Sequence, residues 1–195
     1  MLRIHVPNLE CFCIGFMRDG KSIFSGWHDG KIRSFLPQSG KLLYCISDAH
    51  VNGVTALTST SDGQRLISGG MNGEIRIWRI GRQSQTMESS LKEHRGRVWS
   101  IQVNSLNDRA ISASADGSCI IWDIKSYTRL ACMFENTMFK QLVYHPSESQ
   151  ILTVGSAKKV KIFIIKHMKY ICLSPLSPLL FIHLFRFLIG MLLRL

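Results

Sequence analysis

Two sets of polar and aromatic residues recur in this sequence at one spacing, and their types could support chemistry. In both sets a histidine stands 28 residues before a tryptophan, with a serine and a short acid or amide between them. The members are His50, Ser68, Asn72 and Trp78, then His94, Ser112, Asp116 and Trp122. A histidine placed between a serine hydroxyl and a carboxylate is the arrangement that activates serine nucleophiles in hydrolases. By residue type alone, the second set is a candidate catalytic triad.

The repetition itself favours a structural role over catalysis. Two triads that arise by chance at one register are improbable, and in the first set Asn72 replaces the carboxylate while the rest of the pattern is kept. A histidine that bridges a turn residue and a strand hydroxyl, with the hydroxyl meeting an indole N–H, pairs several buried polar groups at once. We therefore predict two structural tetrads, no catalytic residue, no cofactor-binding residue and no enzymatic activity.

The six cysteines give no indication of a metal site. They form no C-x-x-C pair, and no cysteine–histidine spacing matches a zinc motif. Most lie in apolar, strand-like runs, as small core residues do. We expect no bound metal and a reducing compartment. Because the first residues lack the apolar core of a signal peptide, the sequence predicts a cytosolic protein.

Four repeats must position these side chains. They align on an aromatic residue near the end of the third strand of each repeat, which is Phe35, Trp78, Trp122 and Phe163, at intervals of 43, 44 and 41 residues. In the first three repeats a turn former and a glycine precede this residue, as Asp29-Gly30, Asn72-Gly73 and Asp116-Gly117. Such pairs between two runs of β-branched and aromatic residues predict tight hairpin turns. The pattern therefore predicts short antiparallel strands throughout residues 11–166, with no helix.

The same repeats predict domain boundaries. Residues 1–10 are expected to lead into repeats at 11–47, 48–91, 92–136 and an incomplete 137–166. Residues 167–195 lose the turn signals and are almost entirely apolar. A membrane span needs about 20 predominantly apolar residues, whereas 178–193 supplies 16 that include a histidine and an arginine. We therefore predict an apolar tail foreign to the repeats rather than a membrane span.

The net charge of +11 favours acidic partners such as nucleic acid, an anionic membrane or an acidic protein surface. The basic residues are scattered, so a solvated surface without a polyanionic partner stays an open alternative. Basic residues near aromatics, such as Arg76 with Trp78 and Arg97 with Trp99, match no nucleic-acid motif. We expect protein partners, and neither nucleic acid nor a membrane.

The repeats resemble the WD40 superfamily. The resemblance rests on the histidine-to-tryptophan spacing, on the period of 41 to 44 residues and on the dipeptide Trp122-Asp123. It implies an all-β fold, a WD40 β-propeller of about four consecutive blades of four-stranded antiparallel sheet, which is part of a ring. Two departures are that Ala49 and Glu93 precede the histidines where the superfamily has glycine, and that Arg79 follows Trp78.

A closer resemblance is to the cilia- and flagella-associated WD-repeat family. It is carried by Asp48-Ala49-His50, by Leu91-Lys92-Glu93-His94 and by the stretch from Asp116 to Asp123. The resemblance implies a microtubule inner protein of the axoneme, a non-enzymatic scaffold that contacts tubulin and neighbouring lumenal proteins and supports axoneme stability and motility. It also implies a location in the cytoskeleton of cilia and flagella.

The same resemblance implies that this chain is a truncated segment of a longer, two-propeller protein. A segment of a larger ring is expected to leave apolar faces and unpaired strand edges at its two ends. A generic soluble WD40 adaptor, a membrane-tethered protein and a non-functional truncated isoform stay open as alternatives.

Overall fold

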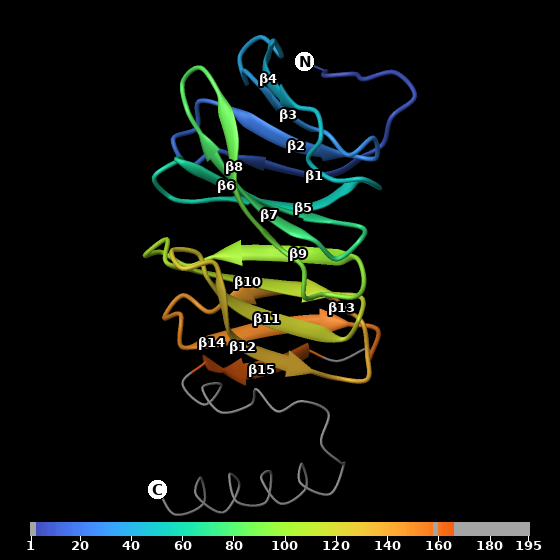
Figure 1. Cartoon of the computed structure of the whole chain (residues 1–195), viewed down its shortest axis with the longest axis vertical. Coiled ribbons are helices and arrows are strands. Elements are labelled where there is room, and N and C mark those ends of the chain that lie inside the picture. The colour runs from blue at the N-terminus through green and yellow to red at the C-terminus, as the bar shows by residue number, and fades with distance from the viewer. Residues whose placement is uncertain (1–2, 158–159, 166–195) are drawn as a thin grey trace, which may run out of the picture.

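The structure is a computed structural model that describes residues 3–157 and 160–165. The predicted apolar tail, 167–195, lies outside the described residues. The described chain is all-β, and its strands form four antiparallel sheets stacked along the long axis of the molecule, as Figure 1 shows. We call these sheets blades 1 to 4, in chain order. The predicted architecture of four consecutive antiparallel blades is confirmed.

The strands follow one another in sequence order across each blade. Blade 1 consists of β1 (Cys11–Phe16), β2 (Ile23–Trp27), β3 (Ile32–Phe35) and β4 (Leu42–Ile46). Blade 2 consists of β5 (Val54–Ser59), β6 (Arg65–Gly70), β7 (Ile75–Ile80) and β8 (Gln85–Leu91). Blade 3 consists of β9 (Val98–Val103), β10 (Arg109–Ser114), β11 (Ser118–Asp123) and β12 (Thr128–Phe134). Blade 4 has three described strands, β13 (Phe139–Tyr144), β14 (Gln150–Gly155) and β15 (Val160–Ile164).

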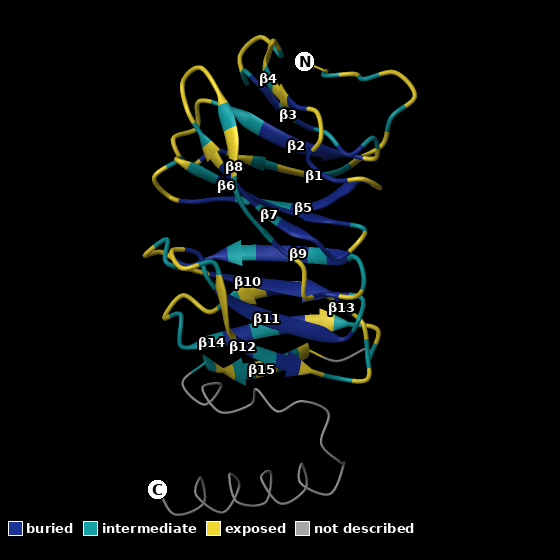
Figure 2. Cartoon of the chain, viewed as in Figure 1, coloured by how far each residue is buried: buried dark blue, intermediate teal, exposed yellow. Residues whose placement is uncertain are grey.

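Alternation along each strand gives every blade two packing faces, because successive side chains of a strand point to opposite sides. In β7, Ile75 and Ile77 join the apolar cluster shared with blade 3, whereas Trp78 joins the cluster shared with blade 1. A third cluster joins blades 3 and 4. The core is thus divided into three joints between neighbouring blades. In Figure 2 the strands β9, β10 and β11, near the middle of the stack, are almost continuously buried.

The first strand of every blade carries a bulge near its start. The pairing skips one residue in β1, β5, β9 and β13, which is Phe12, Thr55, Trp99 and Lys140 respectively. These first strands are also the ones that contact one another from blade to blade. Because a bulge redirects the side chain of the extra residue, the four bulged residues mark the inner edge along which the blades meet.

Candidate functional site

The second predicted tetrad, in blade 3, forms one continuous hydrogen-bonded chain. The indole Nε1 of Trp122 donates to Oγ of Ser112 at 2.8 Å, and the same oxygen lies 2.6 Å from Nε2 of His94. On the other side of the ring, Nδ1 of His94 lies 2.7 Å from Oγ of Ser118 and 3.4 Å from a carboxylate oxygen of Asp116. The structure brings all four predicted residues together and adds Ser118, which sequence reasoning did not single out.

Secondary structure explains this geometry. Ser112 on β10 and Trp122 on β11 share one face of the blade, because Trp122 pairs with Ala110, two residues before the serine. Asp116 lies in the turn between these strands, and His94 lies in the segment that connects blade 2 to blade 3. The backbone N–H of Arg95 donates to Asp116 at 2.7 Å. The tetrad therefore ties the connection between two blades to a turn of the second blade.

The first predicted tetrad, in blade 2, forms only part of the hydrogen-bonded chain. Trp78 Nε1 donates to Ser68 Oγ at 2.9 Å, and that oxygen lies 2.8 Å from His50 Nε2. The Nδ1 atom of His50 is buried and has no hydrogen-bond partner among the described residues. Asn72 instead accepts from the backbone N–H of Glu74 and donates to its carboxylate. The structure therefore brings together His50, Ser68 and Trp78 and leaves Asn72 outside the chain.

Electrostatics differ between the two sets. Burial, helped by the positive charge of Arg76, lowers the pKa of His50 to about 4. Burial alone would raise the pKa of Asp116, but the hydrogen bonds that its carboxylate accepts from His94 and Ser118 hold this pKa well below its usual range. At neutral pH the imidazole of His50 is therefore neutral and Asp116 is charged.

The buried position of the two serines decides what chemistry the tetrads can do. The side chains of Ser68 and Ser112 are 0% exposed, and each oxygen already accepts a tryptophan N–H. A serine nucleophile must reach a substrate carbonyl, and neither oxygen has room or orientation for one. The arrangement can hold a blade together by pairing buried polar groups.

The predicted blade turns adopt the left-handed conformation that glycine favours. Gly30, Gly73 and Gly117 have φ angles of 77°, 81° and 83°. At Gly117 a side chain would also collide with the backbone oxygen of Glu135, whose N–H donates to the Gly117 oxygen at 2.8 Å. The glycine is needed both for its φ angle and for the close approach of the chain that leads into the next blade.

Asp29, in the corresponding turn of blade 1, is paired differently from Asp116. Its carboxylate accepts from the backbone N–H of Lys31 at 3.2 Å and forms a two-pronged ion pair with Arg33, with a shortest distance of 2.7 Å. The hydrogen bonds from Arg33 lower the pKa of Asp29. The guanidinium of Arg33 in turn lies 5.4 Å from the Trp27 ring. The acid therefore stabilises its own turn instead of serving a histidine.

A buried carboxylate in blade 2 was missed by sequence reasoning. The side chain of Glu74 is 4% exposed and accepts hydrogen bonds from Ser90 at 2.5 Å, Arg76 at 3.1 Å and Asn72 at 3.3 Å. Burial alone would raise its pKa, but these donors hold the pKa of Glu74 at about 2. Arg76 also donates to the backbone oxygen of Asp48 at 2.6 Å. The network therefore anchors the connection from blade 1. The available signal in the sequence was an acid and an arginine two residues apart where the third strand of the repeat begins.

Arg97, just before β9, lies between two aromatic rings at the inner edge. Its guanidinium carbon is 4.1 Å from the centre of the Trp99 ring and 4.9 Å from that of the Phe12 ring. The two rings are bulged residues of blades 3 and 1, so the stacked arginine bridges over blade 2. Cation–π stacking accounts for its position without a nucleic acid. The absence of a nucleic-acid partner stays a prediction.

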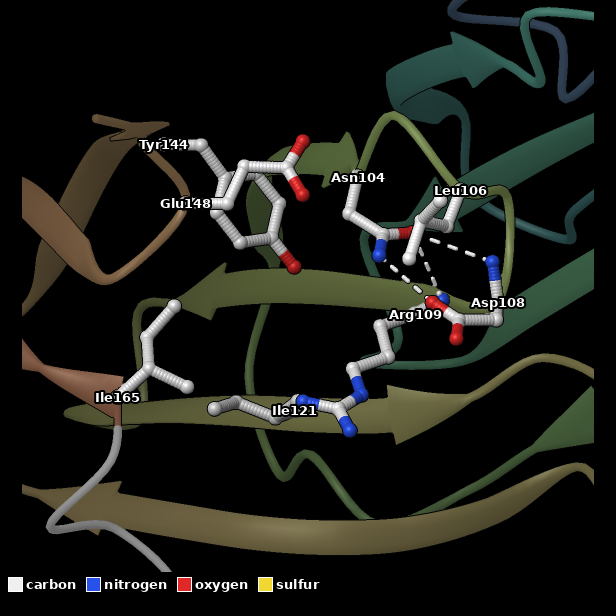
Figure 3. Close-up of a pocket in the computed structure, with 8 residues that line it drawn as sticks. All are labelled: Asn104, Leu106, Asp108, Arg109, Ile121, Tyr144, Glu148 and Ile165. Carbon is white, nitrogen blue, oxygen red and sulfur yellow. Dashed lines mark hydrogen bonds between the residues drawn. The ribbon is translucent and has the colours of Figure 1, made fainter. Parts of the chain in front are cut away.

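A pocket of about 180 Å³ lies between blades 3 and 4. Figure 3 shows its lining residues, which are Asn104, Leu106, Asp108, Arg109, Ile121, Tyr144, Glu148 and Ile165. Several polar groups are already engaged: Asn104 Oδ1 accepts from the backbone N–H groups of Asp108 and Arg109. Glu148 accepts from the backbone N–H of Ser105 at 2.6 Å. Burial, followed by the charge of Glu148, raises the pKa of Tyr144, so the phenol stays neutral.

No cluster of three or more potential metal ligands occurs in residues 3–157 and 160–165. Nor does the described part of the chain contain a helix with the length and apolar character needed to cross a membrane. The segment that raised the question of a span, 167–195, is not among the described residues.

Three features define a WD40-type β-propeller array. They are the stacked antiparallel blades, the hydrogen-bonded histidine, serine and tryptophan in two successive blades, and the glycine turns at the same point of the first three repeats. Residues 40–79 and 85–123 match the family model described as "WD domain, G-beta repeat", and these stretches are WD40 repeats. Among curated proteins, the chain is similar to "Cilia- and flagella-associated protein 52".

The similarity extends over most of this chain. Identity to the Chlamydomonas reinhardtii protein is 56% over 160 residues, which is 82% of this chain and 26% of that protein. Identity to the proteins of the same name from Mus musculus and Homo sapiens is 51%, with the same coverage. The chain thus spans about a quarter of the length of these relatives, which bear names that associate them with cilia and flagella.

Solved structures share the architecture. The structure of U3-55K matches with a TM-score of 0.76 at 22% identity, over 85% of this chain and 52% of that chain. The crystal structure of RRP9 WD40 repeats matches with a TM-score of 0.76 at 23% identity, over 85% of this chain and 51% of that chain. The predicted fold class, a WD40 β-propeller, is confirmed. At these identities the likeness concerns the fold alone.

Proposed function

We propose that this protein is a non-enzymatic structural scaffold of the axoneme of cilia and flagella. The observation that carries the proposal is the 56% identity, over 160 residues, to a protein named for its association with cilia and flagella. In its finer form the proposal is a microtubule inner protein that contacts tubulin and neighbouring lumenal proteins. Such a protein stabilises doublet microtubules and supports motility.

Side-chain burial supports a binding role over a catalytic one. Ser112, the candidate nucleophile, is enclosed and shares its oxygen with Trp122 and His94. Cys119 is buried as well, and burial raises the pKa of its thiol, so it carries no thiolate at neutral pH. Both groups are better explained as parts of the packed fold.

Surface charge supports an acidic protein partner. The chain carries a net charge of +11. Lys92 and Arg79 are 72% and 53% exposed, although they also form ion pairs with Glu74 and Glu88. Positive potential attracts acidic surfaces and speeds association with them. An acidic protein surface such as that of tubulin fits this balance, and the proposal needs neither a nucleic acid nor a membrane.

The test is retention in the axoneme. The full 195-residue chain, tagged and expressed in ciliated cells, is followed through extraction with detergent and then with high salt. We expect signal along the axoneme that resists both steps. Gly117→Ala, which disrupts a blade turn, should lose retention, whereas Gly20→Ala, at a turn with open space around it, should keep it.

Two results would contradict the proposal. One is a signal that stays diffuse in the cell body or leaves the cilium with detergent alone. The other is equal retention of Gly117→Ala and the unsubstituted chain, which would indicate trapping of aggregated protein. A stable soluble complex in cells without cilia would favour a generic WD40 adaptor instead.

A further inference from the structure

The outward face of blade 4 carries the residues that form joints elsewhere in the stack. Counted from the aromatic residue near the end of the third strand, the residue one position earlier faces the following blade. This residue is Ile77 in blade 2 and Ile121 in blade 3, and both are buried. In blade 4 it is Ile162, which is 60% exposed. Val160, two residues earlier on β15, is 64% exposed. We call Val160 and Ile162 the C-terminal face.

The outward face of blade 1 shows the complementary pattern. The residue 21 positions before the same aromatic, on the first strand, faces the preceding blade. It is Ile101 in blade 3 and Leu142 in blade 4, and both are buried. In blade 1 it is Ile14, which is 71% exposed, and its neighbour on the same face, Phe16, is 63% exposed. We call Ile14 and Phe16 the N-terminal face.

The interior joints show which residues such faces bring together. Ile77 of blade 2 and Ile101 of blade 3 lie in one cluster, and Ile121 of blade 3 and Leu142 of blade 4 lie in the next. These two joints thus pair the residue one position before the aromatic of one blade with the residue 21 positions before the aromatic of the following blade. In the joint between blades 1 and 2 the same positions hold Ser34 and Leu57. Ile162 and Ile14 occupy these two positions, so the two end faces are the halves of one more joint of the same kind.

Residue sizes on the two end faces also match. In the joint between blades 2 and 3, a side chain at Gly69 would meet Val98, so a small residue faces a large one. The equivalent of Gly69 in blade 4 is the larger Val154, and the equivalent of Val98 in blade 1 is the smaller Cys11. The order of sizes is thus reversed at the end faces, but the pair still combines one larger and one smaller side chain, which suits close packing.

We propose that this chain binds a second copy of itself head to tail, with the C-terminal face of one copy covering the N-terminal face of the other. The described blades account for 52% and 51% of the two solved WD40 chains they match, so two copies supply about one ring. Two joints then close eight blades, which lies within the range of known propellers. A head-to-tail contact that closes uses up both apolar faces.

The test is the mass of the purified full chain in solution, measured by sedimentation velocity. We expect twice the 22.1 kDa of one chain. Ile162→Asp and Phe16→Asp, each placing a charge on one face, should sediment as monomers. Leu106→Asp is the matched control, because Leu106 is 73% exposed but lies on neither face, and it should stay a dimer. Far-ultraviolet circular dichroism checks that every variant is folded.

Mixing separates head-to-tail pairing from any other contact. Ile162→Asp keeps an intact N-terminal face, and Phe16→Asp keeps an intact C-terminal face. An equimolar mixture can form one intact joint and should recover the dimer, with affinity at least tenfold weaker than that of the unsubstituted chain. A monomeric unsubstituted chain, a dimer that survives both substitutions, or a mixture that stays monomeric at several hundred micromolar overturns the proposal.

Discussion

The side-chain oxygen of Ser112 is a hydrogen-bond partner of two other buried groups. It accepts the Nε1–H of Trp122 at 2.8 Å and lies 2.6 Å from His94 Nε2. Ser112→Ala leaves both buried groups without this partner, so we expect the free energy of unfolding to fall by about 1–3 kcal/mol. Urea denaturation measures the loss. Ser126→Ala, which removes an exposed hydroxyl, should change it by less than about 0.5 kcal/mol, and equal effects would argue against a structural tetrad.

Glu74 makes stability depend on pH in a defined window. Its pKa is about 2 in the folded protein against an ordinary 4.5, so the carboxylate stabilises the fold above about pH 4.5 and loses this effect as pH falls toward about 2. The stability difference between the unsubstituted chain and Glu74→Gln should therefore shrink by about 2–3 kcal/mol on acidification. Denaturation curves across this range measure it. A difference independent of pH would mean that the charge of Glu74 contributes nothing.

The comparison of these two residues shows what repetition can and cannot indicate. Ser112 was found because the same spacing occurs at Ser68, so two weak patterns supported each other. Glu74 occurs once, and its partners Ser90 and Asn72 approach it from a neighbouring strand and a turn. Likewise, the sequence could not show that Asn72 is engaged by Glu74 and leaves His50 without a turn partner. A contact that occurs in one repeat only produces no repeated pattern in the sequence.

At the scale of elements, the hairpin turns before the third strands contact the segments that connect one blade to the next. Gly117 has a φ of 83° and no room for a side chain beside Glu135. Gly117→Ala should lower the free energy of unfolding by about 3 kcal/mol, since left-handed strain of about 1–2 kcal/mol adds to a backbone collision. Gly20→Ala has similar strain, with a φ of 68°, but open space. Thermal unfolding of the two variants compares their losses of stability. Equal losses would show that the structure relieves the collision with Glu135 in Gly117→Ala.

The turns between the first and second strands illustrate a limit of sequence reasoning at this scale. The repeat pattern predicts short strands joined by turns, but it does not predict what the side chains of these turns contact. Asn107 and Glu148 have positive φ angles of 54° and 55°, where the turn of blade 1 has Gly20. Asn107 donates to Ser61 Oγ at 2.6 Å, in the preceding blade, and Glu148 likewise reaches back to blade 3. A non-glycine residue tolerates this backbone because its side chain gains a partner across the joint.

For the whole molecule, stacking predicts uneven stability. Strands β9, β10 and β11 are covered on both sides, whereas within the described part of the chain β1 and β15 belong to blades that have a neighbouring blade on one side only. In monomeric Ile162→Asp we expect amide hydrogens of the first group to exchange roughly tenfold or more slowly than those of the second. Hydrogen exchange read by mass spectrometry measures the ratio. Uniform exchange along the chain would mean that the blades unfold as one unit.

The overall architecture was the most predictable feature. A period of 41 to 44 residues with hairpin turns and a His-to-Trp spacing is enough to indicate consecutive antiparallel blades. The joints were harder, because residues such as Ile77 and Ile101 meet only when two repeats are stacked. The sequence predicted that both ends would be uncovered. It did not show that Ile14 and Ile162 stand at matching positions, since that match requires the observed blade-to-blade contacts.

Strand pairing is confined to the individual blades, and this has a mechanical consequence. Every described strand pairs only within its own sheet, and most strands, such as β1, β9 and β11, run across the long axis of the stack, as Figure 1 shows. Apart from the covalent connection between blades, tension along that axis therefore crosses each joint through apolar side chains and a few loop contacts, while the hydrogen-bond ladders bear little of the load. The molecule is stiff within a blade and compliant between blades. Anchored at both ends to something that bends, it would yield at its joints, one at a time, with each blade still folded.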